Sequence, residues 1–156
     1  MPSVFINKPH HTQELKASCL PACAKMLLDF LGSTTDEAVL RDLLKTSRLG
    51  TPALNILMLN ASLPDTKAEL HRWLLIDLQK YLEAKQQPCI VGVRTGPLPY
   101  WKGRDSLHAI VVHGFDDENI FINDPYFKVK EFLVSNDAFS LAWSRTENIA
   151  ITIERR

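Results

Sequence analysis

Apolar residues follow a helical period in the first third of the chain. In residues 20–31 they recur three and four positions apart, and only Lys25 and Asp29 supply a polar edge. This spacing predicts an almost wholly buried helix, with the following Gly32 as its C-terminal cap. The main stripe consists of Leu20, Ala24, Leu27 and Leu31, and it is flanked by Cys23, Met26 and Phe30.

Two further helices are predicted from local capping signals. Residues 34–37 read Thr-Thr-Asp-Glu, a capping box that predicts a second helix ending near Gly50. Thr51 and Pro52 come next, and a cap residue with proline at the first helical position predicts a short third helix through Asn60.

Residues 62–85 carry two competing patterns. Thr66 and Glu69 have the spacing to cap one long helix. Alternation of apolar and polar residues over 67–72 equally suits a short strand, followed by a helix over 75–84. We favour the strand followed by the helix.

The chain changes character at Pro88, beyond which β-branched runs predict mainly strands. The N-terminal run 4–6 is expected to be an edge strand or an extended arm. Helices first and antiparallel strands afterwards predict an α+β fold, with residues 1–156 forming one domain. The predicted strands are residues 89–93, 108–115, 120–123, 128–134 and 149–153, with a hairpin turn at 116–119 and a short helix at 136–143.

Composition disfavours several classes of function. Lys+Arg and Asp+Glu both number 18, and no basic run interleaves with aromatic residues, which argues against nucleic acid and anionic membranes as partners. No apolar run approaches the length of a membrane span, and the N-terminus lacks the pattern of a secretory signal. The cysteine count of 3 is too low for a disulfide framework. We therefore expect a reducing, cytoplasmic location.

Cys19 is the centre of the candidate chemistry. It falls in the first turn of the predicted helix, with Ser18 as a good N-cap and Pro21 where a missing N–H is tolerated. The thiolate is the nucleophilic form of cysteine, and the N–H groups and dipole of a helix N-terminus favour that anion.

The helix alone does not make Cys19 reactive. Lowering a thiol pKa from about 8.5 to between about 4 and 6 takes roughly 3–6 kcal/mol. A helix terminus supplies about 0.3–2 kcal/mol. A reactive Cys19 therefore needs a cationic partner, most simply an imidazolium.

His108 and Asp124 supply a base and a group to orient it. His108 begins a predicted strand and Asp124 follows the end of the next one, so a hairpin places both at the same end of the sheet. We expect Asp124 to hold one ring nitrogen of His108 while the other faces Cys19. Gln13 is expected to donate its amide N–H, together with the Cys19 backbone N–H, to a developing oxyanion.

These motifs resemble those of the bacteriocin-processing, double-glycine-cleaving peptidases, a branch of the papain-like cysteine peptidases. The similarity covers residues 4–153 and includes Gly50-Thr51 and the strand that begins at Pro88. The motifs are Gln13-x5-Cys19 followed by Pro21-Ala22-Cys23, His108-Ala109-Ile110-Val111-Val112-His113-Gly114, and Asn123-Asp124-Pro125.

The resemblance implies a papain-like fold, with the N-terminal helices packed on the C-terminal antiparallel sheet, and a cysteine peptidase. Cys19 would be the nucleophile, His108 the general base and acid, Asp124 the orienting acid and Gln13 the oxyanion donor. No metal or organic cofactor is called for. The implied partners are a peptide or protein substrate and a neighbouring exporter or precursor peptide.

Two features depart from the family pattern. Many members have Asp-Cys-Gly at the nucleophile where this chain has Ser18-Cys19-Leu20, so we expect Leu20 to narrow or reshape the substrate cleft. The best-known members are domains of export transporters, whereas this chain is expected to be a stand-alone relative, so cleavage after Gly-Gly does not carry over directly.

The remaining cysteines, histidines and aromatic residues have simpler interpretations. Cys23, Cys89 and His113 are predicted to be structural, and His10, His11 and His71 to be surface residues. A zinc site from His10, His11, Cys19 and Cys23 lacks the usual ligand spacing. Trp101 either lines the substrate cleft or anchors the loop that carries it.

Two other functions remain open at this level. The same triad serves acyl transfer to an amine in enzymes of the transglutaminase type, although the sequences around their cysteines differ from residues 18–21. A peptidase-like domain that only binds a peptide has no need of all three groups, which argues against that alternative.

Overall fold

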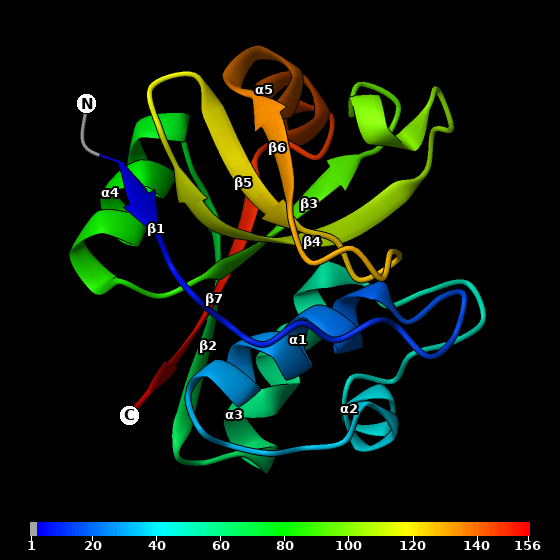
Figure 1. Cartoon of the computed structure of the whole chain (residues 1–156). Coiled ribbons are helices and arrows are strands. Elements are labelled where there is room, and N and C mark those ends of the chain that lie inside the picture. Colours follow the sequence, from blue (N-terminus) through cyan, green and yellow to red (C-terminus); the bar gives the residue numbers. More distant parts are fainter. Residues whose placement is uncertain (1–2) are drawn as a thin grey trace.

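The computed structural model describes residues 3–156 and has an α+β architecture (Figure 1). Its helices are α1 (Cys19–Phe30), α2 (Glu37–Leu43), α3 (Leu59–Ser62), α4 (Leu75–Lys85) and α5 (Asn136–Ser144), with 3-10 helices η1 (Ala53–Met58) and η2 (Pro99–Trp101). Its strands are β1 (Val4–Phe5), β2 (Thr66–Arg72), β3 (Cys89–Arg94), β4 (Leu107–Phe115), β5 (Asn119–Asn123), β6 (Phe132–Ser135) and β7 (Ile149–Arg155).

All the strands join one sheet in the order β2-β7-β3-β4-β5-β6, and β1 pairs with β4. Every pairing is antiparallel. β1 approaches β4 closely at Gly114, where a Cβ would collide with the Val4 carbonyl oxygen and the Phe121 ring. Glycine at this position therefore allows the N-terminal arm to lie against the sheet.

Helices cover both faces of the sheet (Figure 1), and an apolar cluster is buried on each face. On one face, Met26, Leu27 and Leu28 of α1 pack with Leu40 of α2 and Ile56 of η1. On the other, α4 and α5 pack their buried side chains against β3, β4 and β5. The alternation along β4 divides its apolar residues between the layers, which makes it a central strand of the fold.

Most of the predicted elements are present, including the strand and helix favoured over 62–85, which are β2 and α4. Three predictions were wrong in extent. The second helix ends at Leu43 rather than near Gly50, because Lys45 takes a left-handed conformation with φ 55°. The third helix is a 3-10 helix before a single turn of α3. The strand predicted at 128–134 begins only at Phe132, since the register of β5 with β6 leaves residues 124–131 as the connection.

The two ends of α1 differ in how their backbone groups are satisfied. At the C-terminus, the Ser33 N–H donates to the Leu28 carbonyl and the Gly32 N–H to the Asp29 carbonyl, with Gly32 at φ 83°. This is a Schellman motif, as the predicted glycine cap requires. At the N-terminus, the Ser18 side chain makes no cap hydrogen bond, contrary to the prediction. Its hydroxyl instead donates to the Leu15 carbonyl at 2.9 Å and accepts from the Leu15 N–H at 3.0 Å, which closes the preceding loop.

Among residues 3–156, no helix combines the length and the apolar character that crossing a membrane would require.

Candidate active site

Cys19 is the first residue of α1 and lies half-buried at the wall of a cavity of about 480 Å³. His108 from β4 lies in the same wall. Both side chains are held by regular elements, Cys19 by the first turn of α1 and His108 by its pairing with Val93 across β3 and β4. Cys19 therefore borders the cavity at the N-terminus of α1, a helix that packs on one face of the sheet (Figure 1).

His108 and Asp124 form the expected pair. The His108 Nε2 atom lies 2.7 Å from Asp124 Oδ1, and the His108 side chain is 6% exposed. Because Nε2 is bonded to the carboxylate, Nδ1 is the ring nitrogen left for Cys19. Burial lowers the pKa of His108, but hydrogen bonds and charges from Asp124 and Cys19 outweigh burial and raise the pKa to about 9.

The Asp124 carboxylate is fully buried and accepts four hydrogen bonds. Besides His108, the backbone N–H of Tyr126 donates to Oδ1 at 2.9 Å. The Tyr100 hydroxyl and the Trp101 indole N–H donate to Oδ2 at 2.8 and 3.0 Å. Burial acts to raise the pKa of Asp124, yet these donors keep the pKa below its ordinary value. The carboxylate is thus charged and fixed in orientation.

The environment of Cys19 favours its anion. Burial acts to raise the thiol pKa, but the hydrogen bond and charge of His108 outweigh it, with help from backbone hydrogen bonding at Ala109 and Leu20. The pKa of Cys19 therefore lies below its ordinary value, while that of His108 lies above its own. Together these shifts favour a thiolate–imidazolium pair at neutral pH.

Gln13 lies in the loop before α1, but its donors are directed away from an oxyanion. Nε2 donates to the carbonyls of Leu15 and Lys16 at 2.9 and 3.0 Å, which uses both amide hydrogens. Oε1 is buried and has no partner in the described part of the chain. Gln13 does not line the cavity. A role as oxyanion donor therefore requires one of the two amide hydrogens to leave its carbonyl.

The two candidate substrate-binding residues occupy different places. Leu20 is 4% exposed and lines the cavity beside Cys19. Trp101 does not line the cavity. Trp101 packs edge-on against His108, and its indole N–H donates to Asp124. These contacts fit the interpretation of Trp101 as an anchor of its loop.

The cavity is lined mainly by apolar residues, together with the charged residues Arg72, Arg145 and Glu147. Its walls include Ile90, Ile149 and Ile151 from the sheet, residues 49–52 from the segment before η1, and Ala53, the first residue of η1. Arg72 and Glu147 form an ion pair of 3.5 Å among the lining residues. A cavity with such a lining can hold apolar or small groups.

The other cysteines follow the prediction and the other histidines depart from it in part. Cys23 and Cys89 are fully buried, as expected for core residues. His10, His11 and His71 are half-buried rather than free on the surface, because each is bonded across the fold. Their partners are Asn123, Glu37 and Thr152, respectively.

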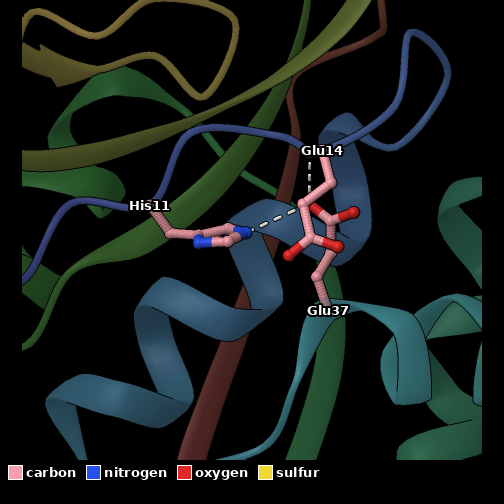
Figure 2. Close-up of side chains that lie close together, drawn as sticks. All are labelled: His11, Glu14 and Glu37. Carbon is pink, nitrogen blue, oxygen red and sulfur yellow. Dashed lines mark hydrogen bonds and ion pairs between the residues drawn. The ribbon is translucent and has the colours of Figure 1, made fainter.

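His11, Glu14 and Glu37 bring three potential metal ligands together (Figure 2). The buried Glu37 carboxylate accepts from His11 Nε2 at 3.1 Å and from the Glu14 backbone N–H at 3.0 Å. Arg41 bonds both carboxylates and so already supplies the positive charge that the cluster needs. We interpret the cluster as an anchor that ties the loop bearing Gln13 to α2.

Several of these contacts lie beyond what sequence reasoning found. The sequence analysis did not assign Tyr100 and Tyr126 to the site, although Tyr100 stands directly before Trp101 in the chain. Glu37 was identified only as part of a helix cap. Tyr100 and Glu37 meet their partners across long separations in the chain, so no local signal links them. Tyr126 lies only two residues after Asp124, but it donates through its backbone N–H, which no residue identity signals.

Comparison with known proteins places the chain among described peptidases. Residues 7–156 match the sequence model described as the Peptidase C39 family, and no curated protein matches. A C39-like peptidase structure from Bacillus anthracis is similar with 20% identity and a TM-score of 0.78, covering 100% of this chain and 99% of that chain.

Two other solved structures are similar over nearly the same length. The peptidase domain of Streptococcus ComA, described as a bifunctional ABC transporter in a quorum-sensing pathway, is 27% identical with a TM-score of 0.76, covering 94% of this chain and 97% of that chain. A double glycine motif protease from an AMS/PCAT transporter, solved with its leader peptide, is 20% identical with a TM-score of 0.75, covering 100% of each chain.

Proposed function

Because this chain belongs to the Peptidase C39 family, we propose that it is a cysteine peptidase in which Cys19, His108 and Asp124 form the catalytic triad. The papain-like α+β fold predicted from the sequence is shared with its structural neighbours. The observation that carries the assignment of the triad is the 2.7 Å contact between His108 and Asp124, beside a cysteine whose pKa is lowered by that same histidine.

The reaction follows from the protonation states that these groups favour. The Cys19 thiolate attacks the carbonyl carbon of the scissile peptide bond and forms a tetrahedral intermediate. The His108 imidazolium gives its Nδ1 proton to the leaving amine, and the C–N bond breaks to leave a thioester. His108 then takes a proton from water as the water attacks the thioester carbon, and the C–S bond breaks to release the carboxylate product and return the Cys19 thiolate. Asp124 keeps the imidazole oriented through both steps.

The oxyanion is proposed to lie at the N-terminus of α1. The Cys19 backbone N–H belongs to the first turn, where N–H groups have no partner within the helix. Ser18 does not cap this turn with its side chain, so the helix end remains available to a negative charge. Gln13 supplies the second donor once its amide releases the Leu15 or the Lys16 carbonyl.

The proposed substrate is a peptide, such as a precursor peptide that is cut before or during export. Two of the similar structures belong to transporters, and one was solved with a leader peptide. Leu20 stands in the cavity wall directly beside the nucleophile, so we propose that it shapes the choice of residues at the cleavage site. A cytoplasmic location is also proposed, supported by the free thiols of Cys19, Cys23 and Cys89.

Digestion of a peptide library with the parent protein and with Cys19→Ala tests the function. The parent should cleave a subset of peptides, and Cys19→Ala should cleave none while keeping the thermal unfolding midpoint of the parent. Equal cleavage by both proteins would refute the assignment. Mass analysis with an added amine distinguishes hydrolysis from acyl transfer, since transfer would leave the amine attached to the product.

A further inference from the structure

The N-terminal arm bonds the turn that carries Asp124 at three points. This turn spans residues 123–127, at the end of β5. In its middle, the Gln13 backbone N–H donates to the Pro125 carbonyl at 2.8 Å. His10 makes the other two contacts, one at each end of the turn. The arm that leads into the helix of the nucleophile is thus joined directly to the segment that holds the orienting carboxylate.

The His10 ring spans the turn with both of its nitrogens. Nδ1 lies 2.6 Å from Asn123 Oδ1, and Nε2 lies 2.9 Å from the Phe127 carbonyl oxygen. Nε2 also lies 3.0 Å from the Thr12 hydroxyl. The Phe127 N–H donates to the Asp124 carbonyl at 3.2 Å. The ring therefore holds both the residue before Asp124 and the residue that closes its turn.

Both nitrogens of His10 face acceptors. Asn123 is 2% exposed, and its Nδ2 donates to the Lys130 carbonyl at 2.8 Å, which fixes Oδ1 toward His10. The Phe127 carbonyl oxygen is an acceptor in any orientation. A neutral imidazole has one N–H donor and the imidazolium has two, so both contacts are hydrogen bonds when His10 is protonated. An ordinary histidine is mostly protonated at pH 6.

The position of this turn decides how well His108 is held. The Tyr126 N–H, inside the turn, donates to Asp124 Oδ1 at 2.9 Å, and the same oxygen lies 2.7 Å from His108 Nε2. A shift of the turn therefore moves the carboxylate together with one of its donors. A misplacement of about 1 Å at a site can cost about 10²-fold in rate, even when its cause lies away from the reacting atoms.

We propose that His10 is a positioning residue of the triad, which fixes the turn that carries Asp124 by bonding both of its ends. His10 does not line the cavity at Cys19, so it acts through Asp124 and His108. The inference rests on the proposed catalytic triad. With the turn fixed, the carboxylate stabilises the His108 imidazolium, and the imidazolium stabilises the thiolate. Removal of the His10 nitrogens therefore weakens the ion pair as well as slowing the reaction.

The experiment compares the parent with His10→Phe, which keeps a ring but has no donor. At pH 6, kcat should decrease on the order of 10-fold, with KM nearly unchanged, because the turn shifts by less than the 1 Å considered above. Alkylation of Cys19 by iodoacetamide should also require a higher pH than in the parent, since a less well held His108 stabilises the thiolate less. A lower unfolding midpoint with an unmoved alkylation profile would show a purely structural role and overturn the inference.

Two further variants sharpen the comparison. His10→Gln keeps one donor, near the position of Nε2, and should recover part of the kcat that His10→Phe loses. His71→Phe is the matched control, because His71 is also half-buried and bonds Thr152 across the fold. It should keep the kcat and the alkylation profile of the parent. Backbone amide spectra show whether each variant keeps its fold.

Failure of this inference is distinguishable from failure of the triad. Parent values of kcat and an unmoved alkylation profile in folded His10→Phe would overturn the role of His10 and leave the triad intact. A parent Cys19 that reacts only like an ordinary thiol would overturn the triad instead. In that case the ring N–H protons of His10, followed by NMR at pH 6, still test the two bonds. Both protons should exchange slowly with water, and rapid exchange of either would show that its bond is not formed.

Discussion

The Trp101 indole N–H donates to Asp124 Oδ2 at 3.0 Å, while His108 contacts the other carboxylate oxygen at 2.7 Å. The loop that carries Trp101 therefore sets the orientation of the carboxylate that orients His108. With Tyr100 on the same oxygen, rotation of the Asp124 carboxyl group would break two hydrogen bonds. This relationship gives a positioning role to a residue that makes no contact with the cavity.

Trp101→Phe should lower kcat about 10-fold and leave KM nearly unchanged, because one donor to the orienting carboxylate is lost while the aromatic packing is kept. Such a decrease corresponds to about 1.4 kcal/mol in the activation barrier. Steady-state kinetics measure kcat and KM, with a library peptide that the parent protein cleaves as the substrate. Tyr100→Phe is the matched variant for the second donor and should act in the same direction. A rise in KM alone would instead indicate direct contact of Trp101 with substrate.

The pH dependence should reflect the two opposite pKa shifts. Iodoacetamide should alkylate Cys19 at pH values below those at which an ordinary thiol reacts, because the pKa of Cys19 is lowered. Peptidase activity should fall as the pH rises through about 9, where His108 loses its proton. In His108→Ala the thiol loses its cationic partner, so the alkylation profile should move to higher pH. An unmoved profile would contradict the ion pair.

The same shift has a consequence for stability. The folded-state pKa of His108, about 9, exceeds its ordinary value of 6.5, so protonation stabilises the fold fully below pH 6.5. This contribution should disappear as the pH rises through about 9. Denaturant unfolding of the parent protein and of His108→Ala at several pH values measures this contribution. The difference between their free energies of unfolding should decrease as the pH rises from 6.5 through about 9.

Gln13→Ala should lower kcat by about 10²–10³-fold if its amide binds the oxyanion, as removal of one such donor does in other enzymes. KM should change little, since the contact is made in the transition state. The side chain also ties the loop through Leu15 and Lys16, so Gln13→Glu is the matched variant that keeps its size. Full activity in Gln13→Glu would rule out the donor role.

Glu37→Gln should weaken the anchor between α2 and the loop that carries Gln13. The carboxylate accepts from His11, the Glu14 N–H and Arg41, and an amide replaces part of this acceptor capacity with donors. A buried N–H left without its acceptor costs about 1–3 kcal/mol, so the midpoint of thermal unfolding should decrease. Glu83→Gln, at an exposed position of α4, is the control and should leave the midpoint unchanged.

Local patterns in the sequence were sufficient for most elements of this fold. The buried stripe of α1 and the glycine at its end are local signals, and they predicted that helix correctly. The predicted lengths of α2 and of the strand at 128–134 were too great. The left-handed turn at Lys45 ends α2, and the register of β5 with β6 sets the start of β6, and both depend on neighbours elsewhere in the chain. Ser18 was placed correctly at the helix start, but Leu15 competes for its hydroxyl.

The sequence by itself determined that Cys19, His108 and Asp124 are candidates for chemistry. Their side chains are intrinsically reactive, and the spacing of His108 and Asp124 is compatible with one end of the sheet. Only the tertiary structure decided what each candidate contacts. Trp101 and Tyr100 reach Asp124, Gln13 bonds Leu15 and Lys16, and His10 bonds Asn123. Hydrogen bonds and burial act over a few ångströms in space, and the chain brings residues within that range only when the sheet and its helices are packed.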